Sequence, residues 1–522
     1  MAYYNPEISQ FGVDILLINP PWISKDENIW HGIKAAMPPL GLLTIAAYLE
    51  QQGHSVKVID VHVDKLSIDQ LRAKIIECQP RVVGVTVLTA TALASYKIAA
   101  LAKESNPKTL VVLGGVHVDA LPGEALGNKY VDIVVRGDGE RTFANIARGE
   151  PIETIKGISY RKNGVVVHNP PSEVIMDLDA IPFPAYHLIA MEKYYPSIGA
   201  YRRLPAINMM MTRGCPGKCT FCNSAETSLR TRSAVKVVEE IIRLKEKYGI
   251  KEIQFYDDTF TVFKKNVFDF CELMIERKVN VSWTAFVRAD CISQKMAYML
   301  KKAGCHQVMF GIESGDEEIR KTIRKPINEE ITRLAIQYCK KAGLEVRGAF
   351  IFGSPGETRE TMQKTLDFAM DIDVDIAIFN ITTPYPGTQL FNWAKGMGYL
   401  KHEDWSAYEL SGCLMELPTV SEKEILSFYE KAHKVFYGRP KMYLKRLLMI
   451  RNIHHLRDSL HAFFYIILRH KAGTRGEVRK DWISLKLQDF FHFDLMGEQK
   501  LFMTSESKKT QLDDQKLVVA RH

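Results

Sequence analysis

The stretch that decides the fold is Met211-Thr-Arg-Gly-Cys-Pro-Gly-Lys-Cys-Thr-Phe-Cys-Asn223. It sets three cysteines, Cys215, Cys219 and Cys222, close together in the chain. Thiolates hold iron–sulfur clusters, and three of them hold a four-iron cube by three corners, which leaves the fourth iron open to a small molecule. Zinc would need a fourth protein ligand nearby, and no histidine lies between His187 and His306. We therefore predict a [4Fe-4S] cluster on these cysteines.

The spacing of the cysteines, with Phe221 before the last, resembles that of the radical S-adenosylmethionine (SAM) superfamily. In that family SAM chelates the open iron, and an electron from the cluster cleaves it to a 5′-deoxyadenosyl radical. The resemblance implies that the three cysteines are the metal ligands and the catalytic residues. It also implies a modest cofactor-binding role for Phe221, beside the adenine of SAM, with ordinary packing as the alternative.

Length and composition favour a multidomain enzyme with one cluster. A chain of 522 residues suggests two to four domains, and 46% hydrophobic with 25% charged residues is ordinary for a soluble protein. No apolar run is long enough to span a membrane, and the first residues lack a basic and apolar signal, so we expect a cytoplasmic protein. The six other cysteines show no second cluster spacing.

The net charge of +8 is concentrated near the C-terminus. Residues 439–480 hold eleven Lys or Arg against Asp458 and Glu477, so the rest of the chain is nearly neutral, which argues against nucleic-acid binding. Apolar residues recur there at helical spacing. Such a helix could lie on an anionic membrane surface or pack on the enzyme with its basic face in water, and both arrangements stay open. We expect a helical extension over 406–497 and a disordered tail over 498–522.

The N-terminal part predicts a doubly wound, Rossmann-like α/β domain over residues 12–150. Short, continuous, β-branched runs read as strands covered on both faces. The expected strands are Asp14–Asn19, Val56–Asp60, Val82–Leu88, Leu110–Gly114 and Asp132–Arg136. The expected helices are Leu40–Gln52, Ser67–Glu77, Ala90–Ser105 and Pro122–Asn128. A ligand of such a domain binds at the carboxyl ends of the strands.

The loops after these strands resemble those of the cobalamin-binding domain found in one group of radical SAM enzymes. They are Asn19-Pro-Pro-Trp22, Thr86–Thr91, Gly114-Gly-Val-His117 and Arg136-Gly-Asp-Gly-Glu140, together with Pro38-Pro-Leu-Gly-Leu42. The resemblance implies cobalamin as a cofactor. The cofactor-binding residues that it implies are Asn19, Trp22, Thr86, Gly114, Gly115, Gly137 and Glu140.

One departure concerns the cobalt ligand. Many cobalamin proteins carry Asp-x-His-x-x-Gly after the first strand, with the histidine bound to cobalt. Here Asn19-Pro-Pro-Trp22 has no histidine, and Asp60-Val-His62 follows the second strand with Lys65 in place of the glycine. We expect no histidine ligand to cobalt. An open lower face would suit methyl transfer, and it would also suit a domain that has lost cobalamin.

A proline-rich connector with a short hairpin-like stretch around Lys162-Asn-Gly164 is expected over 151–202, followed by a partial (β/α)6 barrel over 203–405. The expected barrel strands are Ala206–Thr212, Glu252–Tyr256, Ser282–Phe286, Gln307–Ile312, Arg347–Phe352 and Ile376–Thr382, with helices such as Ala234–Tyr248 and Glu329–Ala342 between them. The cysteine loop follows the first strand, at the barrel end where active sites gather.

Strand ends in this barrel carry residues that the resemblance assigns to SAM. Asp257 and Asp258 follow the second strand, where the family receives the SAM ammonium, although paired aspartates could also cap a helix. Arg288 could pair with the SAM carboxylate or form an ordinary ion pair. The remaining SAM residues implied are Glu313, Ser314 and Gly353.

The resemblance is to the group that holds anaerobic Mg-protoporphyrin monomethyl ester cyclases and hopanoid-modifying enzymes. It implies modification of an unactivated carbon of an apolar small molecule, by methylation or by oxidative cyclisation without methyl transfer. It also implies a reducing partner such as flavodoxin or ferredoxin. A cobalamin- or SAM-binding sensor with a vestigial barrel is the alternative from another class.

Overall fold

The structure, a computed structural model, describes residues 12–22, 35–197, 199–325 and 327–442. Most of the basic segment at 439–480, residues 443–497 of the expected extension and the expected tail lie outside these residues. Within the described residues, no helix combines the length and the apolar character needed to cross a bilayer.

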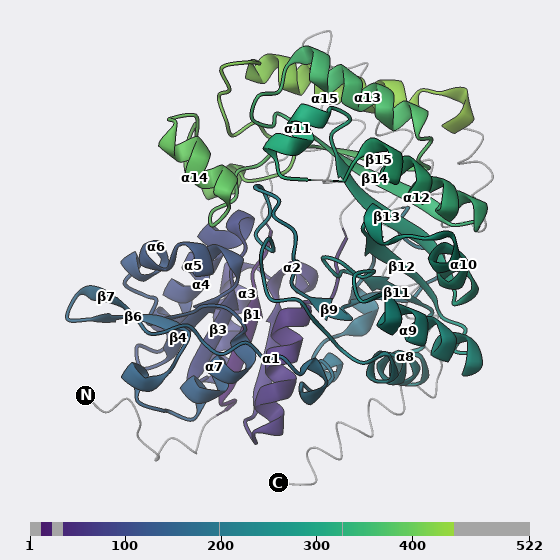
Figure 1. Cartoon of the computed structure of the whole chain (residues 1–522). Helices are drawn as coiled ribbons and strands as arrows, with labels where there is room; N and C mark the ends of the chain where they lie inside the picture. Colours follow the sequence, from purple (N-terminus) through teal and green to yellow (C-terminus); the bar gives the residue numbers. More distant parts are fainter. Residues whose placement is uncertain (1–11, 23–34, 198, 326, 443–522) are drawn as a thin grey trace, which may run out of the picture.

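The first domain is built on a seven-stranded sheet with the order β2-β1-β3-β4-β5-β6-β7 (Figure 1). Its parallel strands are β1 (Ile15–Asn19), β2 (Val56–Asp60), β3 (Val82–Thr86), β4 (Leu110–Gly114) and β5 (Ile133–Val135). The order of β1 to β5 is that of a doubly wound fold, which binds ligands where the strand order reverses. The predicted fold class is therefore confirmed.

Alternate residues of these strands serve two separate cores, as the continuous apolar runs predict. One core joins Leu16 and Val83 to α3 (Ile68–Cys78) and α4 (Ala92–Ser105). The other core covers the opposite face of the sheet with α1 (Leu40–Gln51) and α7 (Gly139–Ala147). The shorter helices of this domain are α2 (Val61–Asp64), α5 (Val116–Ala120) and α6 (Pro122–Gly127).

The first sheet continues past residue 150. The hairpin of β6 (Ile158–Lys162) and β7 (Val165–His168) pairs antiparallel with β5. Its two-residue turn, Asn163-Gly164, has positive φ at both positions, which suits a tight hairpin. The hairpin expected in the connector thus extends the sheet of the first domain.

The second domain is a six-stranded parallel sheet with the order β15-β14-β13-β12-β11-β8. Its strands are β8 (Ala206–Met209), β11 (Glu252–Phe255), β12 (Ser282–Val287), β13 (Cys305–Glu313), β14 (Glu345–Phe352) and β15 (Ile376–Ile381). Its helices are α8 (Ala234–Tyr248), α9 (Lys264–Glu276), α10 (Gln294–Lys302), α11 (Glu317–Thr322), α12 (Glu329–Lys341) and α13 (Arg359–Asp371). The six units follow one another as expected for a partial (β/α)6 barrel.

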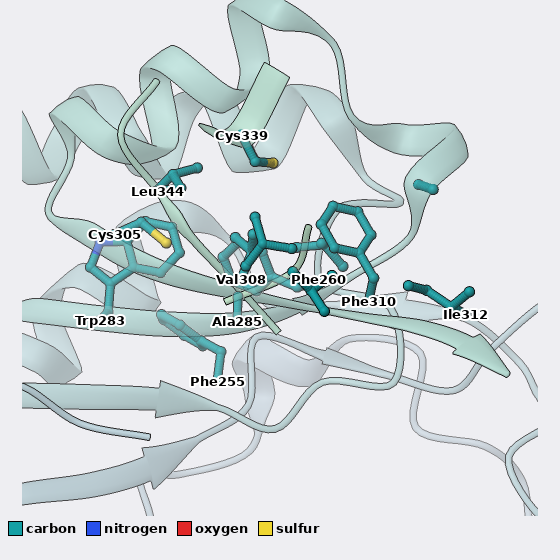
Figure 2. Close-up of a cluster of buried hydrophobic side chains, with 14 of the residues drawn as sticks. Phe255, Phe260, Trp283, Ala285, Cys305, Val308, Phe310, Ile312, Cys339 and Leu344 are labelled. Atoms are coloured by element: carbon teal, nitrogen blue, oxygen red, sulfur yellow. The ribbon is translucent and has the colours of Figure 1, made fainter. Parts of the chain in front are cut away.

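The core of this domain lies between the sheet and its helices. Phe255 and Trp283 meet edge to face at 5.6 Å between ring centroids, and Phe260 packs beside them (Figure 2). Val308 and Phe310 continue the same face along β13. The opposite face of the sheet is therefore the one available for ligands.

The chain leaves the barrel through α14 (Gln389–Gly396) and ends its described course in α15 (Glu422–Tyr437). Phe391, Trp405 and Tyr408 belong to the α3 and α4 core of the first domain. The segment after the barrel thus returns to the first domain and joins the two.

Candidate active site

The three cysteines lie on a loop held at its neck by a short antiparallel ribbon, β9 (Thr212–Arg213) with β10 (Arg230–Thr231). Inside the loop, the amide of Cys215 donates to the hydroxyl of Thr227 at 3.0 Å, and the amide of Thr227 donates to the carbonyl of Cys215 at 3.1 Å. These bonds tie the two ends of the loop to each other.

The first barrel strand is shorter than predicted for a specific reason. The buried carboxylate of Asp257 accepts hydrogen bonds from the amides of Met211 and Thr212 and from the hydroxyl of Thr212, the last at 2.7 Å. These amides therefore do not continue the ladder of β8. Burial raises the pKa of Asp257 to about 6, against the opposing effect of these hydrogen bonds. The carboxylate expected to receive SAM thus holds the chain that leads into the cysteine loop.

Asp258 is the exposed member of the aspartate pair and faces the loop. It interacts with Ser224 and lies near Cys222, and the partial burial of its carboxyl raises its pKa although the side chain as a whole is exposed. Of the two aspartates, Asp258 has its carboxylate available for a ligand.

The thiols have the surroundings that a cluster needs. All three are half-buried and unbridged. Burial raises the pKa of Cys219 and of Cys222 above the usual thiol value, which opposes the thiolate form that a cluster binds, and the Lys325 ammonium counteracts this effect at Cys219. A side chain at Gly217 would stand 3.2 Å from the sulfur of Cys215 and 3.9 Å from that of Cys219, so a glycine keeps the space between them open.

Among the described residues, no three His, Cys, Asp or Glu side chains converge closely enough for a single metal ion. A cube takes its three thiolates on three different irons. The donor set and the open space fit such a cluster.

Glu313 and Lys325 form an ion pair beside the loop, with 3.1 Å between Oε1 and Nζ. Glu313 ends β13 with a left-handed φ of 70°, and a side chain at Gly311 would stand 2.5 Å from its carboxylate. Burial would lower the pKa of Lys325, but Glu313 and Cys219 raise it above its usual value. Lys325 therefore adds a cation near the cluster cysteines.

Sequence reasoning missed Lys325, because it lies on an irregular segment between α11 and α12. That segment is tied to the cysteine loop by a hydrogen bond from the amide of Thr220 to the carbonyl of Ile323 at 3.1 Å. No pattern of residue spacing in the sequence indicates this contact.

Arg288 forms an ordinary ion pair within the protein and also faces the cysteine loop, so its position is compatible with both roles considered from the sequence. Its Nε and Nη2 bind the two oxygens of Asp290 at 3.1 and 2.7 Å, and this pairing raises its pKa. Its Nη1 would stand 3.5 Å from a side chain at Gly217, so this nitrogen faces the cysteine loop. One edge of the guanidinium is used by the protein, and the other is directed at the site.

The other residues assigned to SAM have different surroundings. Ser314 is buried, and its hydroxyl bonds that of Thr365 at 3.0 Å. A side chain at Gly353 would meet Ile425 of α15 at 3.2 Å, and its φ of 82° explains the glycine. Phe221 packs against the core of the second domain.

A cavity of about 560 Å³ lies between the strand ends of the first domain and the cysteine loop. The predicted cobalamin residues that line it are Thr86, Gly114, Gly115, Gly137 and Glu140. On the barrel side it is lined by Met209 to Gly214, Asn223, Ser224 and Asp258. At Gly114 the nearest atom to an added side chain would be Val135 at 3.8 Å, so the backbone itself forms the wall. Such a wall suits a large flat cofactor.

Two predicted cobalamin residues lie elsewhere. The side-chain amide of Asn19 donates to the carboxylate of Asp60 at 3.0 Å. Neither Asn19 nor the exposed Trp22 is among the described residues that line the cavity. No histidine is among these lining residues either. His117 is buried and meets the ring of Trp405 at 5.0 Å, away from the lining.

Two ion pairs connect the cysteine loop to the cobalamin-type domain. Arg213 and Arg230 stand opposite each other on the β9–β10 ribbon. Arg213 binds Glu140 at 2.7 Å, and Arg230 binds Asp138. We call these four residues the loop clamp. One glycine-rich loop thus both lines the cavity and holds the neck of the cysteine loop.

The comparisons with known proteins agree with this arrangement. Residues 209–369 match the radical SAM superfamily and residues 31–147 match the B12 binding domain. An uncharacterized methyltransferase of Pyrococcus horikoshii is 37% identical over 439 residues, which are 83% of this chain and 94% of the relative. The chain belongs to the radical SAM superfamily and carries a B12-binding domain.

Two further relatives have specific names. The cytidylyl-2-hydroxyethylphosphonate methyltransferase of Streptomyces wedmorensis is 30% identical over 76% of this chain and 84% of its own. The anaerobic magnesium-protoporphyrin IX monomethyl ester cyclase of Rubrivivax gelatinosus is 31% identical over 72% of this chain and 69% of the relative.

Solved structures share the fold. The cobalamin-dependent SAM radical enzyme OxsB, with aqua-cobalamin and SAM bound, aligns with a TM-score of 0.67 and 16% identity over 98% of this chain and 81% of that one. The methyltransferase TsrM of Kitasatospora setae aligns with a TM-score of 0.60 and 19% identity over 75% of this chain and 76% of the TsrM chain. The chain is thus an enzyme of the cobalamin-dependent radical SAM class, with a [4Fe-4S] cluster, SAM and cobalamin as cofactors.

Proposed function

We propose that this enzyme methylates an unactivated carbon of a small, largely apolar molecule. The observation that carries the proposal is the shared cavity, because strand-end loops of the B12-binding domain and residues next to Cys222 line the same space. The names of two relatives, both methyltransferases, support the same reaction.

When bound, SAM and the cluster supply a radical that removes a hydrogen atom from the substrate, and cobalamin supplies the methyl group. The protein binds, orients and excludes water. In this proposal Cys215, Cys219 and Cys222 hold the cluster, while Asp258 and Arg288 face SAM. The loop clamp fixes the distance between the two cofactors.

Reconstitution tests the reaction. The enzyme is loaded anaerobically with iron, sulfide and cobalamin, supplied with SAM, a flavodoxin or ferredoxin reductant and candidate substrates, and the products are analysed. We expect S-adenosylhomocysteine together with 5′-deoxyadenosine. 5′-Deoxyadenosine alone would contradict methyl transfer and favour oxidation or cyclisation, the second of which is the reaction named for the third relative.

A variant with alanine at Cys215, Cys219 and Cys222 tests the cluster assignment. It should release no 5′-deoxyadenosine under reducing conditions, because no thiolate remains to hold the cluster. A variant with alanine at the buried Cys78, Cys271 and Cys339 is the control and should keep its iron. Release of 5′-deoxyadenosine by the first variant would refute the assignment.

A further inference from the structure

The inner face of the second sheet carries one layer of side chains from four adjacent strands. The strand registers place Tyr256 of the β11 end beside Phe286 of β12, Phe286 beside Met309 of β13, and Met309 beside Arg347 of β14. All four side chains are half-buried, whereas their outward neighbours such as Phe255 are fully buried. This layer therefore keeps part of its surface free of protein contacts.

Arg347 is a cation without an acidic partner among the described residues. Its Nη1 donates a long hydrogen bond of 3.4 Å to Gln307, and its buried Nε has no acceptor. The adjacent acid, Glu345, pairs with Arg202. Burial lowers the pKa of Arg347 below its usual value, yet a guanidinium stays charged in proteins. Tyr437, Tyr256 and Glu345 oppose this effect electrostatically, but no carboxylate among the described residues forms an ion pair with Arg347. A buried charge without a direct partner is costly, so the site favours an anion.

The other members of the layer offer a flat apolar surface. The rings of Tyr256 and Phe286 are stacked, with 5.5 Å between centroids and 13° between planes. The hydroxyl of Tyr256 is bound to Gln254 at 3.1 Å, which fixes the ring. A planar ligand body can pack against this pair while its acidic group meets Arg347.

This layer is separate from the residues that face the cluster. Glu313, which pairs with Lys325 beside Cys219, lies four residues beyond Met309 on the same strand. On the neighbouring strands the layer is closer to the site, because Tyr256 is two residues before Asp258 and Phe286 is two residues before Arg288. At about 3.3 Å per residue, the layer therefore lies roughly 7 to 13 Å deeper in the barrel than the residues that face the cluster.

We infer that Arg347, with Tyr256 and Phe286, binds the acidic group of the substrate, a carboxylate or phosphonate on a planar apolar body. The inference rests on the proposed function and sharpens it, because an acid anchored deep in the barrel leaves the opposite end of the molecule near the cluster loop.

Binding of a probe tests the inference without requiring the natural substrate. Phenylphosphonate, benzoate and the neutral benzamide are titrated into the reconstituted enzyme with saturating SAM and cobalamin, and their dissociation constants are measured by saturation-transfer NMR. We expect either anion to bind at least about tenfold more tightly than benzamide, as a charged hydrogen bond in a half-buried site implies. The two anions distinguish a phosphonate from a carboxylate preference. Equal binding of benzamide, or no binding of either anion, would overturn the inference.

Variants locate the bound anion. Arg347→Met should weaken anion binding by about tenfold or more, Arg347→Lys should weaken it less, and Arg333→Met, on the exposed face of α12, should not change it. Undiminished binding to Arg347→Met, or loss of the probe as SAM is raised, would place the anion elsewhere and refute the inference. If Arg347→Met does not fold, the comparison of the anions with benzamide in the unaltered enzyme still tests whether the site prefers an acidic group. Since no radical is involved, failure of the proposed reaction would appear separately, as absent S-adenosylhomocysteine.

Discussion

Asp257 and Asp258 are neighbours with separate tasks. Asp257 is buried and accepts the amides of the chain that enters the cysteine loop, while Asp258 is exposed beside Ser224 and Cys222. The sequence correctly marks the strand end as important. It does not say which carboxylate is used by the protein, because strand geometry turns successive side chains to opposite sides.

Gly217 offers a direct test of the space between the cluster sulfurs. Gly217→Val should reduce the iron bound after reconstitution by roughly half or more, because its side chain would intrude between Cys215 and Cys219. Iron content and the absorbance of the cluster measure the effect. Gly396→Ala, where an added side chain meets nothing within 4 Å, is the control. Full cluster loading of Gly217→Val would show that this space is not needed.

Glu357 predicts a pH dependence of stability. Its carboxyl is fully buried, one oxygen accepts from the amide of Ser354 at 2.8 Å, and the other has no partner. Burial raises its pKa from 4.5 to about 8. Between these values the folded protein keeps a proton that the unfolded chain has released, so this group makes stability fall as pH rises from 4.5 to 8.

Glu357→Gln should remove that dependence. The amide resembles the protonated carboxyl, so the variant should match the unaltered enzyme near pH 5 and be more stable by roughly 2–4 kcal/mol at pH 9. Denaturant unfolding at several pH values measures this, with the exposed Glu360→Gln as the control. Parallel pH profiles of the two proteins would contradict the assignment.

At the scale of elements, the parallel strands could be predicted closely from the sequence. β4 has the predicted bounds, because both of its faces are covered and its apolar run is continuous. β2 also has the predicted bounds, although it is an edge strand and its Lys57 is exposed. The β6–β7 hairpin was expected, but its pairing with β5 was not, since tertiary contacts decide where an edge strand joins. The cavity-lining glycines could be predicted because they stand in loops directly after strands. Lys325 could not be predicted, because only tertiary contacts bring it near Cys219.

The loop clamp connects two elements and should control how the two cofactors cooperate. Glu140 is buried, and its pair with Arg213 joins α7 to the β9–β10 ribbon. Breaking a buried pair leaves an uncompensated charge and costs several kcal/mol, so Glu140→Gln should let the cysteine loop shift relative to the cobalamin cavity. The ratio of S-adenosylhomocysteine to 5′-deoxyadenosine should fall by about tenfold.

The control for the clamp is Glu150→Gln, which removes an exposed pair with Arg148 in the same domain and should leave the ratio unchanged. Cobalamin content is measured in parallel, so that loss of the cofactor is distinguished from loss of alignment. An unaltered product ratio in Glu140→Gln with full cobalamin would mean that the clamp does not align the cofactors.

At the scale of the whole molecule, Trp405 ties the end of the barrel to the first domain. It is buried, its Nε1 donates to Glu124 at 3.1 Å, and its ring meets His117 at 5.0 Å. Tyr96 donates to the same carboxylate at 2.9 Å. These contacts come from segments almost 300 residues apart in the chain (281 between Glu124 and Trp405) and make unfolding of the two domains interdependent.

This interdependence predicts that cobalamin stabilises the barrel as well as its own domain. A ligand that binds only the folded state raises the unfolding temperature of everything that unfolds with its site. In the unaltered enzyme, scanning calorimetry should show one main transition whose midpoint temperature rises when cobalamin is added.

Trp405→Ala removes a large buried ring at a cost of about 3–5 kcal/mol. This variant should split the transition in two, and the transition of the barrel should no longer respond to cobalamin. Trp393→Ala is the control, because Trp393 packs against Tyr399 and the barrel core rather than the first domain. A barrel transition that still follows cobalamin in Trp405→Ala would show that the loop clamp alone couples the domains.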